Sequence, residues 1–269
     1  MPLSPDVIDD LPYVEGVLNY LAPMAERPMN LAYDPPPGVP RSTGMPEPHR
    51  VTIYDARPLA GRLSLDSEGL AVVKHNSAVR DFYDEDELRR VYYPESERLV
   101  AEVTGATRVL VFDHTVRRRV RGGVDRSAGT PRQPVTAVHN TVKSGPQRVR
   151  DLMGEEAEEL LRHRFEIVNV WRPIRGPLRD APLAVCDATT VAFTDFVPSD
   201  LVYRDRTGET TASHTTLPTA GSMCRRCRRT KRSLSNATIR PRINQGSPPT
   251  PPLKTRPPQP TCCPAKASN

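Results

Sequence analysis

The sequence predicts an α+β protein with a β-sandwich or jelly-roll core, helices on one side of that core and a disordered C-terminal tail. Short apolar segments dominate the second half of the chain, without the strand–helix alternation of a doubly wound fold. All 14 aromatic residues lie at or before Tyr203. A segment without aromatic residues, rich in small, basic and proline residues, cannot bury a core. The tail is therefore expected to begin near residue 210.

Charge divides the chain at the same place. From Thr210 onward there are eleven Lys and Arg residues and no Asp or Glu, whereas the whole chain carries a net charge of +6. Residues 1–209 therefore carry a net charge of −5. The sequence pI of about 9.2 reflects the tail, so the body gives no support to a nucleic-acid-binding function.

Three parts are expected: an extended lead-in over residues 1–50, a β-sandwich domain over 51–209 and the tail over 210–269. Prolines between residues 35 and 48 disfavour regular structure in the lead-in. The predicted strands are Val51–Tyr54, Leu70–Lys74, Arg108–Arg118, Phe165–Trp171, Leu183–Cys186 and Leu201–Arg204. The predicted helices are Glu85–Tyr93, Glu95–Val103, Gln147–Met153 and Glu155–His163, with Pro94 separating the first two and Gly105 as a helix stop.

The cysteines and the N-terminus indicate the compartment. No run approaches the roughly 18 apolar residues that a membrane span needs, and the first residues lack the basic and apolar regions of a signal peptide. Cys186 is the single cysteine of the body, with four more in the tail. A body without a disulfide framework favours a reducing compartment. We expect a cytoplasmic protein without a membrane partner.

Five segments of the body carry a family resemblance. They are IYDARPL (53–59), FDHTVRRR (112–119), VHN…TVKSGPQRV (138–149), IVNVWRPIRGPLRDAPLAVCD (167–187) and DFVPSDLVYRDRTGET (195–210). With these motifs, residues 51–209 resemble the cephem-methoxylase and gibberellin-desaturase-like family of oxidoreductases (the CmcJ/AsaB type). The resemblance implies a double-stranded β-helix (jelly roll) that uses Fe(II) and 2-oxoglutarate to hydroxylate or desaturate a small specialised metabolite.

The same resemblance implies a metal site that this chain carries only in part. The family's motif His-Asn-Asp-Tyr-Thr supplies a histidine and a carboxylate, and a later histidine completes the facial triad of a non-haem iron centre. Here His139-Asn140 is followed directly by Thr141, so the Asp-Tyr pair is missing. His139 is therefore the one metal ligand expected, and the chain is expected to bind neither Fe(II) nor 2-oxoglutarate.

The tail has a second interpretation, a shifted reading frame. Thr211–Met223 can be encoded by bases that spell YSVTYNPAHRWFY when read one base earlier, which restores the family's distal histidine. Thr230–Pro241 conceals DEALFIKCYDSA in the same way. We hypothesise that a one-base frameshift near Thr210 replaced the native C-terminus. The jelly roll would then be incomplete, and little or no turnover is expected.

Three further residues are candidates for substrate or cosubstrate binding: His114, Arg117 and Arg172. Arginine pairs with carboxylates through two hydrogen bonds, and His114 lies beside a run of three arginines. The alternatives are a solvated strand end for His114 and Arg117 and a structural salt bridge for Arg172. Two other function classes stay open, an S-adenosylmethionine-dependent methyltransferase and a basic-tailed nucleic-acid-binding protein. Against a methyltransferase, the sequence has no glycine-rich turn after a predicted strand, which a cofactor site of that kind requires.

Overall fold

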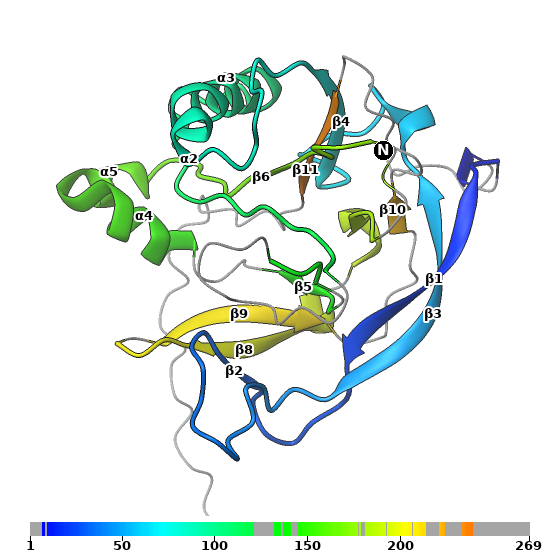
Figure 1. The fold of residues 1–269 in the computed structure, drawn as a ribbon, viewed down its shortest axis with the longest axis vertical. Coiled ribbons are helices and arrows are strands. Elements are labelled where there is room, and N and C mark those ends of the chain that lie inside the picture. The colour runs from blue at the N-terminus through cyan, green and yellow to red at the C-terminus, as the bar shows by residue number, and fades with distance from the viewer. Residues whose placement is uncertain are drawn as a thin grey trace, which may run out of the picture.

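Three small sheets and a group of helices build the computed structural model (Figure 1). It describes residues 7–8, 10–120, 132–135, 137–140, 145–176, 178, 181–191, 193–205 and 207–213, together with strands at 221–223 and 233–238. The helices α2, α3, α4 and α5 gather on one side of the view, and the long strands β1 and β3 lie on the other (Figure 1). The expected placement of helices on one side of a β core agrees with this arrangement.

The first sheet has the order β1-β3-β10-β7. β1 (Tyr13–Leu21) pairs antiparallel with β3 (Pro46–Asp55) from Tyr13↔Tyr54 to Leu21↔Pro46. Burial alternates along the second half of β3, where Val51 and Ile53 face a core cluster with Tyr20. The boundary expected at residue 50 therefore falls inside a strand, and much of the lead-in belongs to the sheet.

The second sheet has the order β4-β11-β6, with β4 at Leu70–His75 and β6 at Asn169–Trp171. Leu70 and Val72 of β4 are buried in the larger core cluster, with Leu59 and Val185. The predicted strand 165–171 is present only at its last three residues.

The third sheet has the order β2-β8-β9-β5. Its strands are β2 (Met29–Leu31), β8 (Phe196–Val202), β9 (Thr207–Ser213) and β5 (His139–Asn140). Thr211 and Ser213 are 2% and 3% exposed, and β9 pairs with β8 along its whole length. The folded body therefore extends past the expected boundary at residue 209.

A nearly continuous helical stretch follows β4. It consists of α2 (Glu85–Glu87), a π-helical turn η2 (Leu88–Tyr92) and α3 (Tyr93–Thr104). Asp84 caps its start, and Gly105 ends it with φ of 70°. Pro94 does not break the helix as expected, because it occupies the first turn of α3, where no helical donor is lost. The other helical elements are α4 (Gly145–Met153), η4 (Gly154–Glu156) and α5 (Ala157–Leu160).

The strand predicted over 108–118 is wrong. This segment crosses the middle of the view between β6 and β9 without joining a sheet (Figure 1). Its described backbone contacts are a bridge between Arg117 and Arg132 and a hydrogen bond from the Val111 amide to the Glu97 carboxylate. β-branched residues favour an extended backbone, but a strand also needs a partner ladder.

Two short strands lie in the tail. β10 (Gly221–Met223) runs between β3 and β7 (Ala184–Cys186), and β11 (Ser233–Thr238) runs between β4 and β6. Beyond Ser213, these strands are the parts of the tail that the structure describes, so the disorder expected elsewhere in 210–269 stays a prediction. Among the described residues, no helix has the length and apolar character needed to cross a membrane.

Candidate functional site

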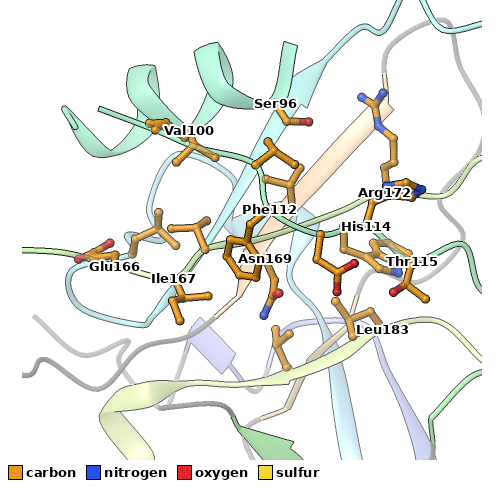
Figure 2. A pocket seen from close by; sticks show the side chains of 18 of the residues that line it. Ser96, Val100, Phe112, His114, Thr115, Glu166, Ile167, Asn169, Arg172 and Leu183 are labelled. Carbon is orange, nitrogen blue, oxygen red and sulfur yellow. The ribbon is translucent and has the colours of Figure 1, made fainter. Parts of the chain in front are cut away.

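A large cavity of about 1650 Å³ lies between α3, the segment after it, β5, α4 and β6. In Figure 2, Ser96 and Val100 on α3 lie on one side of it, Phe112 and Asn169 near its centre, and Leu183 on the other side. Glu166 marks one end, and His114, Thr115 and Arg172 gather at the opposite end (Figure 2). Protein sites for small molecules usually occupy 300–1,000 Å³, so this cavity has room for a large ligand.

All four predicted site residues line this cavity: His114, Arg117, His139 and Arg172. They lie in separate segments of the sequence, which did not predict that they are close in space. The fold brings all four to the same cavity. Their roles stay predictions. Their contacts differ greatly from one residue to the next.

His114 contacts a tyrosine through one ring nitrogen and a glutamate through the other. Its Nδ1 lies 2.7 Å from the Tyr93 hydroxyl, and its Nε2 lies 3.0 Å from a carboxylate oxygen of Glu85. Glu85 also binds Arg89 one helical turn later, at 2.6 Å. The side chain of His114 is 22% exposed, so the alternative of a solvated strand end does not describe it. Burial raises the pKa of Tyr93 above its ordinary value.

Arg172 is buried in an aromatic and imidazole environment. Its guanidinium carbon lies 5.2 Å from the ring centre of Tyr92 and 5.7 Å from that of Phe82. One Nη donates to His75 Nδ1 at 2.9 Å and to the His75 carbonyl at 3.2 Å. Burial, followed by the charge of Arg172, lowers the pKa of His75. In Figure 2 the guanidinium extends away from Phe112 and Asn169, so these contacts are those of a residue that packs the wall.

Arg117 and His139 are held more loosely. Arg117 is exposed and donates to the Gln133 carbonyl at 2.9 Å. His139 lies on the two-residue strand β5, is exposed, and places its Nδ1 3.0 Å from the Ala137 carbonyl. β5 pairs with β9 through His139↔Ala212 and Asn140↔Thr211.

The described residues around His139 do not complete a mononuclear iron site. Such a site needs three ligands on one face of the metal, and within the described ranges no group of three His, Cys, Asp or Glu side chains could hold an ion. Thr141–Ser144, directly after β5, and residues 214–220 lie outside the described residues.

Sequence reasoning missed Tyr93, Glu85 and His75. Glu85 and Tyr93 enter the sequence analysis only as the two ends of a predicted helix. No spacing rule links them to residue 114, because the contact depends on how the segment after Gly105 folds back against α3. Cys186, which lines the same cavity, is a free thiol whose pKa is raised by burial, as a structural cysteine would show.

Comparison with known proteins identifies the family. A family profile described as "Oxidoreductase/YMDC permease-like domain" matches residues 18–217. The chain belongs to this oxidoreductase family. It is 30% identical to the hydroxylase/desaturase efuI of Hormonema carpetanum over 203 residues, which cover 71% of this chain and 68% of that protein. It is also 30% identical to the Fe(II)/2-oxoglutarate-dependent dioxygenase nvfI of Aspergillus novofumigatus, with 69% and 68% covered.

The chain spans about half the length of other relatives that it matches. It covers 54% of an oxidoreductase of Emericella nidulans, to which it is 34% identical over 59% of its own length. A solved structure of the iron and alpha-ketoglutarate-dependent endoperoxidase NvfI superposes with a TM-score of 0.70 at 24% identity, over 88% of this chain and 93% of that chain. This likeness establishes the oxygenase jelly-roll fold. None of the relatives named here is a methyltransferase or a nucleic-acid-binding protein, so those alternatives gain no support.

Proposed function

We propose that this chain derives from an iron and 2-oxoglutarate-type oxygenase of the CmcJ/AsaB type, which hydroxylates or desaturates a small specialised metabolite in the cytoplasm. The observation that carries the proposal is the cavity of about 1650 Å³, which collects all four predicted site residues in a chain of this oxidoreductase family. The named relatives include hydroxylases/desaturases and dioxygenases.

We further propose that the chain as written does not turn over substrate. His139 is one imidazole at the cavity wall, and the Asp-Tyr pair that would supply the carboxylate after Asn140 is missing, since Thr141 follows Asn140 directly. A single neutral imidazole supplies neither the number of ligands nor the negative charge that an Fe(II) site needs. When present, iron would supply the oxidising chemistry, and the residues of this chain would only bind and orient the ligand.

The positions of β10 and β11 support the frameshift hypothesis. Because YSVTYNPAHRWFY is collinear with Thr211–Met223, its last three residues fall on Gly221–Met223, which is β10. In the same way LFIKCY falls on Ser233–Thr238, which is β11. Both strands lie between two others in their sheets, where apolar and aromatic side chains are favoured over Gly, Ser and Asn.

The first experiment tests the reading frame and the metal site together. The coding DNA around codons 139–142 and 209–212 is sequenced, and a restored chain is made with Asp-Tyr after Asn140 and the alternative-frame sequence from residue 211. We expect anaerobic titration to show Fe(II) binding by the restored chain and none by the 269-residue chain. The restored chain with His139→Ala is the control and should lose the metal. Iron- and keto-acid-dependent product formation by the 269-residue chain would overturn the proposal.

A second experiment tests the strand positions without any metal. Replacing Ser233–Thr238 by LFIKCY should raise the free energy of unfolding, because each newly buried apolar side chain contributes about 1.5–3 kcal/mol. The control is a variant in which the same six positions carry polar residues whose side chains match LFIKCY in length. Denaturant unfolding that shows no gain over this control would contradict the assignment of β11 to an out-of-frame apolar strand.

A further inference from the structure

The chain Tyr93–His114–Glu85 runs from the cavity to the surface. Tyr93 and His114 line the cavity. The side chain of Glu85 is 53% exposed and lies on the outer side of His114. A hydrogen bond of 2.7 Å joins Tyr93 and His114, whose rings meet edge to face at 5.6 Å, and His114 Nε2 lies 3.0 Å from the Glu85 carboxylate.

The direction of these hydrogen bonds follows from the chemistry of the end groups. A carboxylate oxygen can only accept a hydrogen bond, so the 3.0 Å approach of Glu85 places the hydrogen of the His114 ring on Nε2. In the neutral ring Nδ1 is then an acceptor, and the Tyr93 hydroxyl donates to it. Burial raises the pKa of Tyr93, which keeps the phenol protonated at neutral pH.

This arrangement leaves the Tyr93 oxygen as an acceptor toward the cavity. A phenol has one hydrogen, and His114 takes it. The oxygen can then only accept a further hydrogen bond through its lone pairs. It can therefore bind a ligand O–H but not a ligand carbonyl. The π-helical turn η2 directly before Tyr93 is a feature often found at functional sites. It lets Tyr92 face Arg172 while the next residue faces His114.

We propose that Tyr93, with His114 and Glu85 as positioning residues, is a hydroxyl-binding site for an apolar ligand that carries a phenolic or enolic O–H group. The inference rests on the cavity being the small-molecule site of the proposed function, but it does not require iron. The apolar lining around Phe112, Ile167 and Leu183 accommodates the ligand's body, and Tyr93 selects the hydroxyl.

The same chain provides a route by which the hydroxyl can lose its proton. The ligand O–H bond breaks as its proton passes to the Tyr93 oxygen, and the original Tyr93 proton passes to His114 Nδ1. The Nε2 proton of His114 then moves to Glu85, which exchanges it with solvent. The ligand is left as a phenolate or enolate, Glu85 becomes neutral, and no electron is transferred. Tyr93 and His114 end with the same number of protons as before.

The test uses 2-naphthol, whose excited state gives up its proton to a nearby acceptor and then emits at longer wavelength, and 2-methoxynaphthalene, which has no hydroxyl. The purified 269-residue chain should bind 2-naphthol about three- to tenfold more tightly than 2-methoxynaphthalene, which is the contribution of one hydrogen bond. Bound 2-naphthol should show naphtholate emission. Tyr93→Phe should bind both probes equally and lose that emission. Tyr13→Phe, on the exposed face of β1, is the matched control and should behave as wild type.

A second measurement addresses variants that fold poorly. Long-range ¹⁵N–¹H NMR of the histidine rings should show His114 with its hydrogen on Nε2 and a hydrogen-bonded Nδ1, and Tyr93→Phe should change the Nδ1 shift alone. Equal affinity for the two probes, or unchanged selectivity in Tyr93→Phe, would overturn the hydroxyl site while leaving the cavity as a ligand site. Failure to bind either probe would overturn both the hydroxyl site and the cavity's role in the proposed function.

Discussion

Two walls of one cavity differ in how firmly their side chains are held. The tyrosine wall, formed by Tyr92, Tyr93, His114 and Arg172 with His75 behind Arg172, is held by hydrogen bonds and ring contacts. The β5 wall consists of β5 and its partner β9, and its single candidate ligand is an exposed histidine with a bond to a backbone carbonyl two residues away. One wall is held by contacts between side chains, and the other carries His139 as its one expected metal ligand among the described residues.

The two walls are also built from different parts of the chain. The tyrosine wall is built from α3 and from segments before residue 173, and the tail strand β11 pairs with β4 at His75 and with β6 at Trp171, the residue before Arg172. The β5 wall is built where the sequence departs from the family and where β9 leads into the tail. A change in the tail would therefore reach both walls, the β5 wall through β9 and the tyrosine wall through β11.

Removal of the Arg172 side chain should have the largest effect and would break the tyrosine wall. Arg172 is 9% exposed and stacks on Tyr92 and Phe82. Arg172→Ala should lower the free energy of unfolding by about 2–3 kcal/mol, measured by denaturant titration. His139→Ala, the matched change on the β5 wall, should alter it by less than about 0.5 kcal/mol. Equal losses in the two variants would contradict the comparison.

Acidification should weaken the same wall by a smaller amount. Burial and Arg172 lower the pKa of His75 in the folded protein, while the unfolded chain keeps a value of about 6.5. The unfolded state therefore binds more protons between these two values, so stability falls as pH falls through this window. His75→Gln cannot titrate and should lose less stability between pH 7.5 and pH 5.5 than wild type. A larger loss of stability in His75→Gln than in wild type would contradict this pH dependence.

The sequence predicted those parts of the fold that depend on local pattern. The strands at 51–54 and 70–74 and the helices around Glu95–Val103 and Gln147–Met153 are present, because their apolar period and their end signals are encoded within each segment. The strand at 108–118 was wrong because its composition specifies an extended backbone but not a partner. The ladder of β1 with β3 was missed because proline density between them hid a long-range pairing.

The candidate site was predictable to a lesser extent. His114, Arg117, His139 and Arg172 were found by motif, and the fold places all of them on one cavity. For two of them the partner that defines the chemistry is far away in sequence: His75 is 97 residues from Arg172, and Tyr93 is 21 residues from His114. Such contacts are set by the packing of α3 against the segments beside it, and no spacing pattern in a single sequence reports them.

The smallest expected effect concerns the sheet behind the β5 wall. Arg27 forms ion pairs with Asp200 on β8 and with Glu209 on β9, and it joins the loop before β2 to the strand that holds β5. Its side chain is 46% exposed, so Arg27→Gln should cost only about 0.5 kcal/mol. High salt should shrink that difference, since exposed pairs are screened. Denaturant unfolding of both proteins at low and high ionic strength measures it. A loss that equals that of Arg172→Ala and does not change with salt would mean that the β5 wall is held as firmly as the tyrosine wall.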